Sequence, residues 1–61
     1  MKTIASAVEV YVKSKPFLIS ALTQGIINLT SLSRIMLEDI KDQTQRPVRT
    51  GAIVMALKRL S

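Results

Sequence analysis

The chain has 61 residues, enough for a single domain near the lower size limit for independent folding. It contains no Cys and no His, which excludes disulfides and the usual nitrogen and sulfur ligands of metal sites. Nine Lys and Arg residues against four Asp and Glu residues give a net charge of +5, which favours a polyanionic partner such as nucleic acid or an anionic membrane surface. Because the core of so short a chain is small, we expect support from a second copy or a following domain.

Apolar residues recur at helical spacing along the whole chain. The pattern predicts an all-α fold, a compact bundle of four short helices at about residues 3–13, 16–24, 30–42 and 49–60. Thr3 is expected to be the N-cap of the first helix, because its hydroxyl can accept a free N–H group of the first turn. The inward face of this helix is expected to hold Ile4, Ala7, Val8, Tyr11 and Val12.

Pro and Gly mark the two ends of the second helix. Pro16 fits the first turn, where no N–H donor is needed, and Gly25 suits the left-handed conformation that ends many helices. The expected buried stripe of this helix consists of Phe17, Leu18, Ala21 and Leu22.

The third helix follows a short connector, and its N-cap is either Asn28 or Thr30. The polar stretch from Asp42 to Pro47 is expected to form a loop, because Pro47 disfavours helical angles at the residue before it. The expected inward residues of the third helix are Leu32, Ile35, Met36 and Ile40.

The last helix has the most regular apolar stripe in the chain. Its members are Ile53, Ala56, Leu57 and Leu60. On a helical wheel the other side then carries Gly51, Met55, Lys58 and Arg59. This helix therefore combines a core-facing stripe with a basic outer side.

Catalysis is not expected of this chain, and we predict no cofactor, metal or small-molecule substrate. General acid–base chemistry needs a His or a carboxylate pair in a desolvated pocket, and a chain of this length cannot enclose a cavity of several hundred Å³. Glu38, Asp39 and Asp42 cluster near the end of the third helix. They are interpreted as a solvated acidic patch that pairs with Lys41 or with neighbouring arginines.

The charge distribution points to nucleic acid. From residue 46 to the end of the chain there are four cations and no acid: Arg46, Arg49, Lys58 and Arg59. The first two lie at or just before the start of the last helix, where free N–H groups already favour a phosphate. A helix with an apolar stripe toward the core and a slim basic face toward solvent can enter a major groove.

Two segments together resemble the helix-turn-helix of winged-helix regulators. They are the run from Gly25 to Ile35 and the run from Gly51 to Leu60, which carries the Ala-Leu-x-x-Leu pattern of a recognition helix. The chain is also similar to the N-terminal part of small uncharacterised prokaryotic proteins that continue into an ACT-like domain. The resemblance implies a single helix-turn-helix-like domain over residues 1–61. The chain is then either the N-terminal fragment of a longer protein or a complete four-helix miniature.

These observations lead to one main hypothesis, a DNA-binding module of a transcriptional regulator with double-stranded DNA as its partner. The last helix is its expected recognition helix, Gly51 allows close approach at the leading end, and Ser31 or Arg34 adds a backbone contact from the third helix. The full set of expected DNA-contacting residues is Arg46, Arg49, Thr50, Gly51, Lys58, Arg59, Ser31 and Arg34.

The alternative hypothesis is a helical dimerisation or protein-interaction module that binds no nucleic acid. It rests on apolar residues that remain after each helix has one buried stripe, namely Ile19, Leu37, Val54 and Met55. Membrane binding is not expected, because Trp is absent and the basic residues do not follow one long amphipathic helix. Glu9 and Lys13 interrupt any signal-peptide core, so a cytoplasmic location is expected.

Overall fold

The computed structural model describes residues 3–60, and these form four α-helices and no strand. The all-α bundle of four helices predicted from the sequence is therefore confirmed, and three of the four predicted ranges agree to within one residue. The expected single domain also includes residues 1, 2 and 61, which lie outside the described part. The helices are α1 (Ile4–Lys13), α2 (Pro16–Gln24), α3 (Leu29–Thr44) and α4 (Thr50–Leu60).

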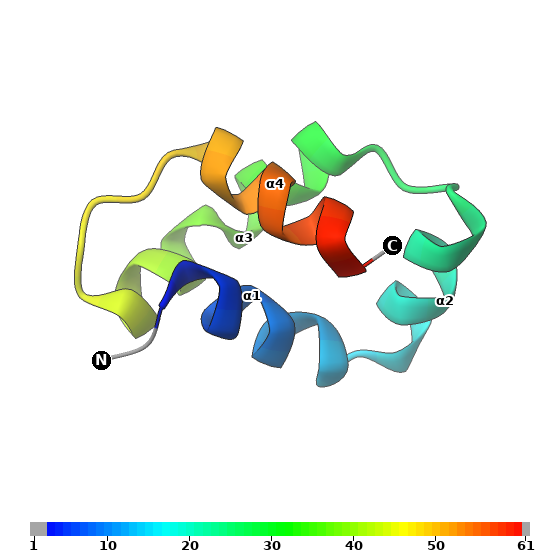
Figure 1. The fold of residues 1–61 in the computed structure, drawn as a ribbon, viewed down its shortest axis with the longest axis horizontal. Helices are drawn as coiled ribbons and strands as arrows, with labels where there is room; N and C mark the ends of the chain where they lie inside the picture. Colours follow the sequence, from blue (N-terminus) through cyan, green and yellow to red (C-terminus); the bar gives the residue numbers. More distant parts are fainter. Residues whose placement is uncertain (1–2, 61) are drawn as a thin grey trace.

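Helices α1 and α4 connect the bundle. In Figure 1, α1 and α4 lie side by side, with α3 behind them and α2 at one end of the bundle. Helix α4 packs against the other three helices, and α1 does so as well. The shared core consists of Ala7, Val8, Val12, Leu18, Leu22, Leu32, Met36, Ile40, Val48, Ile53, Ala56 and Leu57.

Local chemistry sets the ends of the first two helices, as the sequence predicted. Thr3 Oγ1 accepts a hydrogen bond from the backbone N–H of Ser6 at 3.1 Å, so Thr3 caps α1. Pro16 is the first residue of α2. Gly25 ends α2 with a left-handed φ of 71°, and its N–H donates to the carbonyl of Leu22 at 3.1 Å.

Helix α3 begins at the first of the two alternatives that the sequence left open. Asn28 is the N-cap, and its Oδ1 accepts a hydrogen bond from the backbone N–H of Ser31 at 3.1 Å. Thr30 lies inside the helix, where its carbonyl accepts a bond from the Ser33 hydroxyl at 2.7 Å.

The end of α3 differs from the prediction. The predicted helix ended at Asp42, and the loop expected from there to Pro47 is wrong for Gln43 and Thr44, because α3 continues to Thr44. Thr44 has no exposed surface, and its hydroxyl donates to the carbonyl of Ile40 at 2.8 Å. Burial of this side chain keeps the last turn helical, and Gln45 then ends the helix with a φ of 54°.

Two of the residues expected to face inward are exposed instead. Phe17 is 68% exposed and Ile35 is 71% exposed. Phe17 lies about 100° around α2 from Leu18, which is the residue that α2 turns into the core. On α3 the core side is occupied by buried Ser33 and Thr44 together with larger apolar residues, which leaves Ile35 on the opposite side.

Candidate nucleic-acid interface

The outward side of α4 follows directly from its buried side. Ile53, Ala56 and Leu57 are buried against the rest of the bundle. The residues that recur at helical spacing on the opposite side are all exposed, and Met55 in the middle is 59% exposed. We define the outer face of α4 as Gly51, Met55 and Lys58.

The leading end of α4 is open. Arg49 is exposed and directly precedes the helix, and its carbonyl accepts the N–H of Ala52 at 3.1 Å. Thr50, the first helical residue, is half-buried, and Gly51 is exposed. A Cβ atom added at Gly51 would meet nothing within 4 Å. The first turn therefore has open space at Gly51, next to the exposed residue Arg49, at the end of the helix that carries positive partial charge.

The connector before α4 is held by one buried residue. Val48 is only 6% exposed and belongs to the core, whereas its neighbours from Gln45 to Pro47 and Arg49 are exposed. This anchor fixes the direction in which the chain enters α4, and so the position of Arg49. Sequence reasoning gave Val48 no role, although an isolated apolar residue in a polar stretch is the signal that could have found it.

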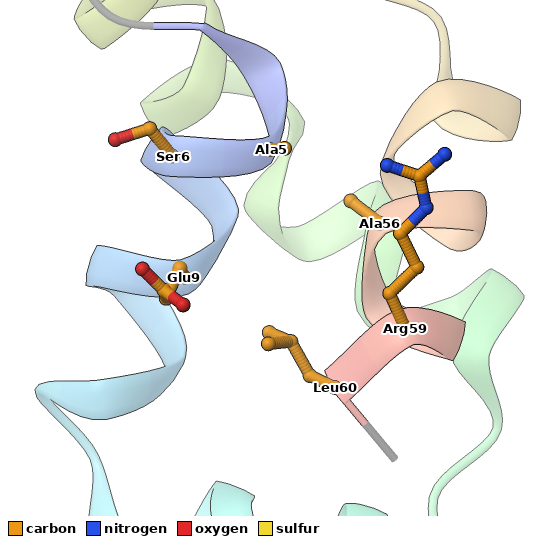
Figure 2. Close-up of a pocket in the computed structure, with 6 residues that line it drawn as sticks. All are labelled: Ala5, Ser6, Glu9, Ala56, Arg59 and Leu60. Atoms are coloured by element: carbon orange, nitrogen blue, oxygen red, sulfur yellow. The ribbon is translucent and has the colours of Figure 1, made fainter.

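Arg59 lies at the edge of α4 that faces α1, not on the outer face. It lines a hollow of about 210 Å³ between the two helices, together with Ala56, Leu60 and residues of α1 (Figure 2). Its guanidinium extends along α4 beside Ala56 rather than across the hollow toward Glu9 (Figure 2). The Glu9 carboxylate instead pairs with Lys13 on its own helix at 3.6 Å.

The two expected residues of α3 lie on a surface of different charge. Ser31 and Arg34 are exposed, and helical spacing puts them on the same side as Glu38 and Asp42. This side therefore mixes one cation with carboxylates, in contrast to the connector and α4, where residues 46–60 contain no acid. Ser31 and Arg34 thus lie on a side of α3 whose charge differs from that of the outer face of α4.

The acidic residues of α3 lie at the surface, and two of them have partners on the same helix. Glu38 Oε1 lies 4.0 Å from Lys41 Nζ, and Asp39 Oδ2 accepts a hydrogen bond from Gln43 Nε2 at 3.0 Å. Within residues 3–60, no three His, Cys, Asp or Glu side chains are grouped closely enough to hold a metal ion. In the same range, every helix is too short or too polar to cross a membrane.

Comparison with known proteins gives no match: no family model fits the chain, and neither a curated protein nor a solved structure is significantly similar to it.

Proposed function

We propose that this chain binds double-stranded DNA through α4, as the recognition helix of a helix-turn-helix domain in a transcriptional regulator. The observation that carries the proposal is the exposed outer face of α4, which runs from an open leading end to Lys58. The major groove of B-DNA is wide enough to admit an α-helix, provided that one side of the helix is free. A helix buried all round could not be used in this way.

The charges around this face suit the two phosphate backbones that border a groove. Arg46 and Arg49 lie before the helix, whereas Lys58 and Arg59 lie near its end. Such contacts supply affinity and register but no sequence information. Helix α4 contains no Asn or Gln for base readout, so Met55 would contribute an apolar contact of the kind that thymine methyl groups accept.

Salt dependence tests the proposal. Binding to a fluorescein-labelled 20-base-pair duplex is measured by fluorescence anisotropy between 50 and 200 mM NaCl. If the four cations neutralise four phosphates, counterion release predicts a log–log slope of about −3.6 and a loss of affinity of about 100-fold. An affinity that does not change with salt, or no binding at 50 mM, overturns the proposal.

A matched pair of variants separates a contact by α4 from a general effect of net charge. Lys58 and Lys13 are both exposed, and both lie in the last turn of their helix. Lys58→Gln should make the salt slope shallower by about one unit, while Lys13→Gln should leave it unchanged. Equal effects of the two substitutions would mean that DNA is bound without preference for α4.

Gly51→Ala tests close approach at the leading end without a cost in stability. The added methyl group meets nothing inside the chain. Ala is favoured over Gly by about 0.5–1 kcal/mol in a helix interior, which is the upper limit for this first-turn position. We therefore expect a more stable protein that binds the duplex more weakly. Unchanged affinity would show that the DNA does not approach the helix at Gly51.

A further inference from the structure

The exposed sides of α3 and α4 carry the same arrangement of residue types with opposite charge. On α3, the exposed Ile35 is followed at i+3 and i+4 by Glu38 and Asp39. On α4, the exposed Met55 is followed at the same spacing by two cations. A small exposed residue lies four positions before each of these apolar residues. The two quartets are Ser31, Ile35, Glu38, Asp39 and Gly51, Met55, Lys58, Arg59.

The apolar centres of the two quartets are both exposed to solvent. Ile35 is 71% exposed and Met55 is 59% exposed. Residues spaced by three and four positions lie on one side of a helix. On α3 the two carboxylates of the quartet outnumber Arg34, the cation on that side. On α4 both charged members are cations, with Lys58 on the outer face and Arg59 toward α1. A contact between one such side and the other would bury both apolar centres and bring opposite charges together.

We infer that a second copy of this chain docks the exposed side of its α3 on the outer side of α4. If the two helices run parallel, the shared spacing brings Ile35 against Met55 and Glu38 against Lys58. The small residues Ser31 and Gly51 allow the helix backbones to approach each other at the same time. The opposite charges give the pairing its register and its choice of partner.

The expected association is weak. A standard protein interface takes about 800 Å² from each partner, which is roughly one fifth of the 4004 Å² surface of this chain. A single helix side supplies less than that, so the association should appear only at high protein concentration. The charged contacts are exposed, so it should also weaken as salt rises.

The self-association does not depend on the proposed DNA function, but one consequence does. Because the second copy would cover Met55 and Lys58, it would compete with DNA for the outer face of α4. In the self-associated state, the α3 carboxylates would occupy the positions that DNA phosphates occupy in the DNA complex. Raising the protein concentration would favour the self-associated state over the DNA complex.

Charge reversal with mixing tests the inference by sedimentation equilibrium, without DNA. Glu38→Lys and Lys58→Glu each put like charges together, and each alone should associate more weakly than the unaltered chain by on the order of tenfold. In a 1:1 mixture of the two variants, position 38 of either variant meets the opposite charge at position 58 of the other. The mixture should therefore associate as strongly as the unaltered chain.

Two control variants of equal net charge accompany the test. Glu9 and Lys13 are exposed on α1, so Glu9→Lys and Lys13→Glu alter net charge by the same amounts without changing either quartet. They should associate as the unaltered chain does. The inference is overturned if the unaltered chain stays monomeric at millimolar concentration. It is also overturned if the charge-reversal variants associate as strongly as their controls, or if the mixture associates no more strongly than each variant alone. None of these outcomes bears on DNA binding by the monomer.

Discussion

The orientation of α4 about its own axis determines which of its side chains are exposed to a partner. Substitutions at Ile53 and Met55 test this orientation. Ile53 has no exposed surface, whereas Met55 is 59% exposed, although only two residues separate them. Ile53→Val removes one buried methylene group and should lower the free energy of unfolding by about 0.5–1.5 kcal/mol. Met55→Ala removes a larger group from the surface and should change it by no more than about 0.5 kcal/mol.

The conservative change at Ile53 is chosen because the whole fold is only marginally stable. A domain of 61 residues has a free energy of unfolding of about 3–9 kcal/mol. Truncation of a buried Ile to Ala costs about 2–5 kcal/mol, which would leave little folded protein to measure. The Ile53→Val variant should remain folded, and its loss of stability still shows whether residue 53 is buried.

Urea unfolding followed by circular dichroism at 222 nm measures both changes, with a constant m-value as evidence that the unfolded state is unaffected. The decisive comparison is between the two sites, because the larger truncation is expected to have the smaller effect. A loss of about 2 kcal/mol or more at Met55 would place that side chain in the core. The outer face of α4 would then not be available to DNA, and DNA binding through this face would be refuted.

Two further predictions concern the left-handed residues that end α2 and α3, and the same urea experiment measures both. Gly25→Ala should destabilise the fold by about 1–2 kcal/mol, because φ is 71° there and an added Cβ has open space but an unfavourable backbone. Gln45→Gly should stabilise it by about 0.5–1 kcal/mol, because φ is 54° at a residue with a side chain. The Gln45 side chain also donates to the carbonyl of Asp42 at 2.6 Å, which makes the gain smaller. Changes of the same sign at both positions would contradict the argument.

The helix ends that could be predicted are those that one residue determines by itself. Pro16 and Gly25 impose backbone conformations whatever surrounds them, so the bounds of α2 follow from the sequence alone. The end of α3 has a different origin. Gln45 has no intrinsic preference for a left-handed conformation, and the last turn is helical because the tertiary structure buries Thr44.

The core-facing stripe of α3 was predicted at Leu32, Met36 and Ile40, but its two polar members were not. Ser33 and Thr44 are fully buried, and their hydroxyls donate to backbone carbonyls of the same helix at 2.7 and 2.8 Å. Bonded in this way, a small hydroxyl residue can be buried at little cost, which a pattern of apolar residues does not reveal. The prediction therefore gave a core position to Ile35, which the structure turns toward solvent.

The outward side of α4 was predicted correctly because the apolar pattern of that helix is regular. The stripe of α4 contains only apolar residues at helical spacing, and the exposure of Gly51, Met55 and Lys58 agrees with the helical wheel. The wheel could not show that Arg59 faces a hollow beside α1, because that depends on how two helices pack. Nor could it show that Val48 anchors the connector.

The two proposals use the same surface of α4, so substitutions at Lys58 affect both and cannot tell them apart. Glu38 lies on α3 and belongs only to the proposed contact between copies. Glu38→Lys should therefore weaken self-association and, by removing a competing carboxylate, strengthen DNA binding at high protein concentration. At low concentration, where the chain is monomeric, its affinity for DNA should change no more than that of Glu9→Lys, which has the same net charge. A gain that is independent of protein concentration would instead mean that α3 itself faces the DNA, as first expected for Ser31 and Arg34.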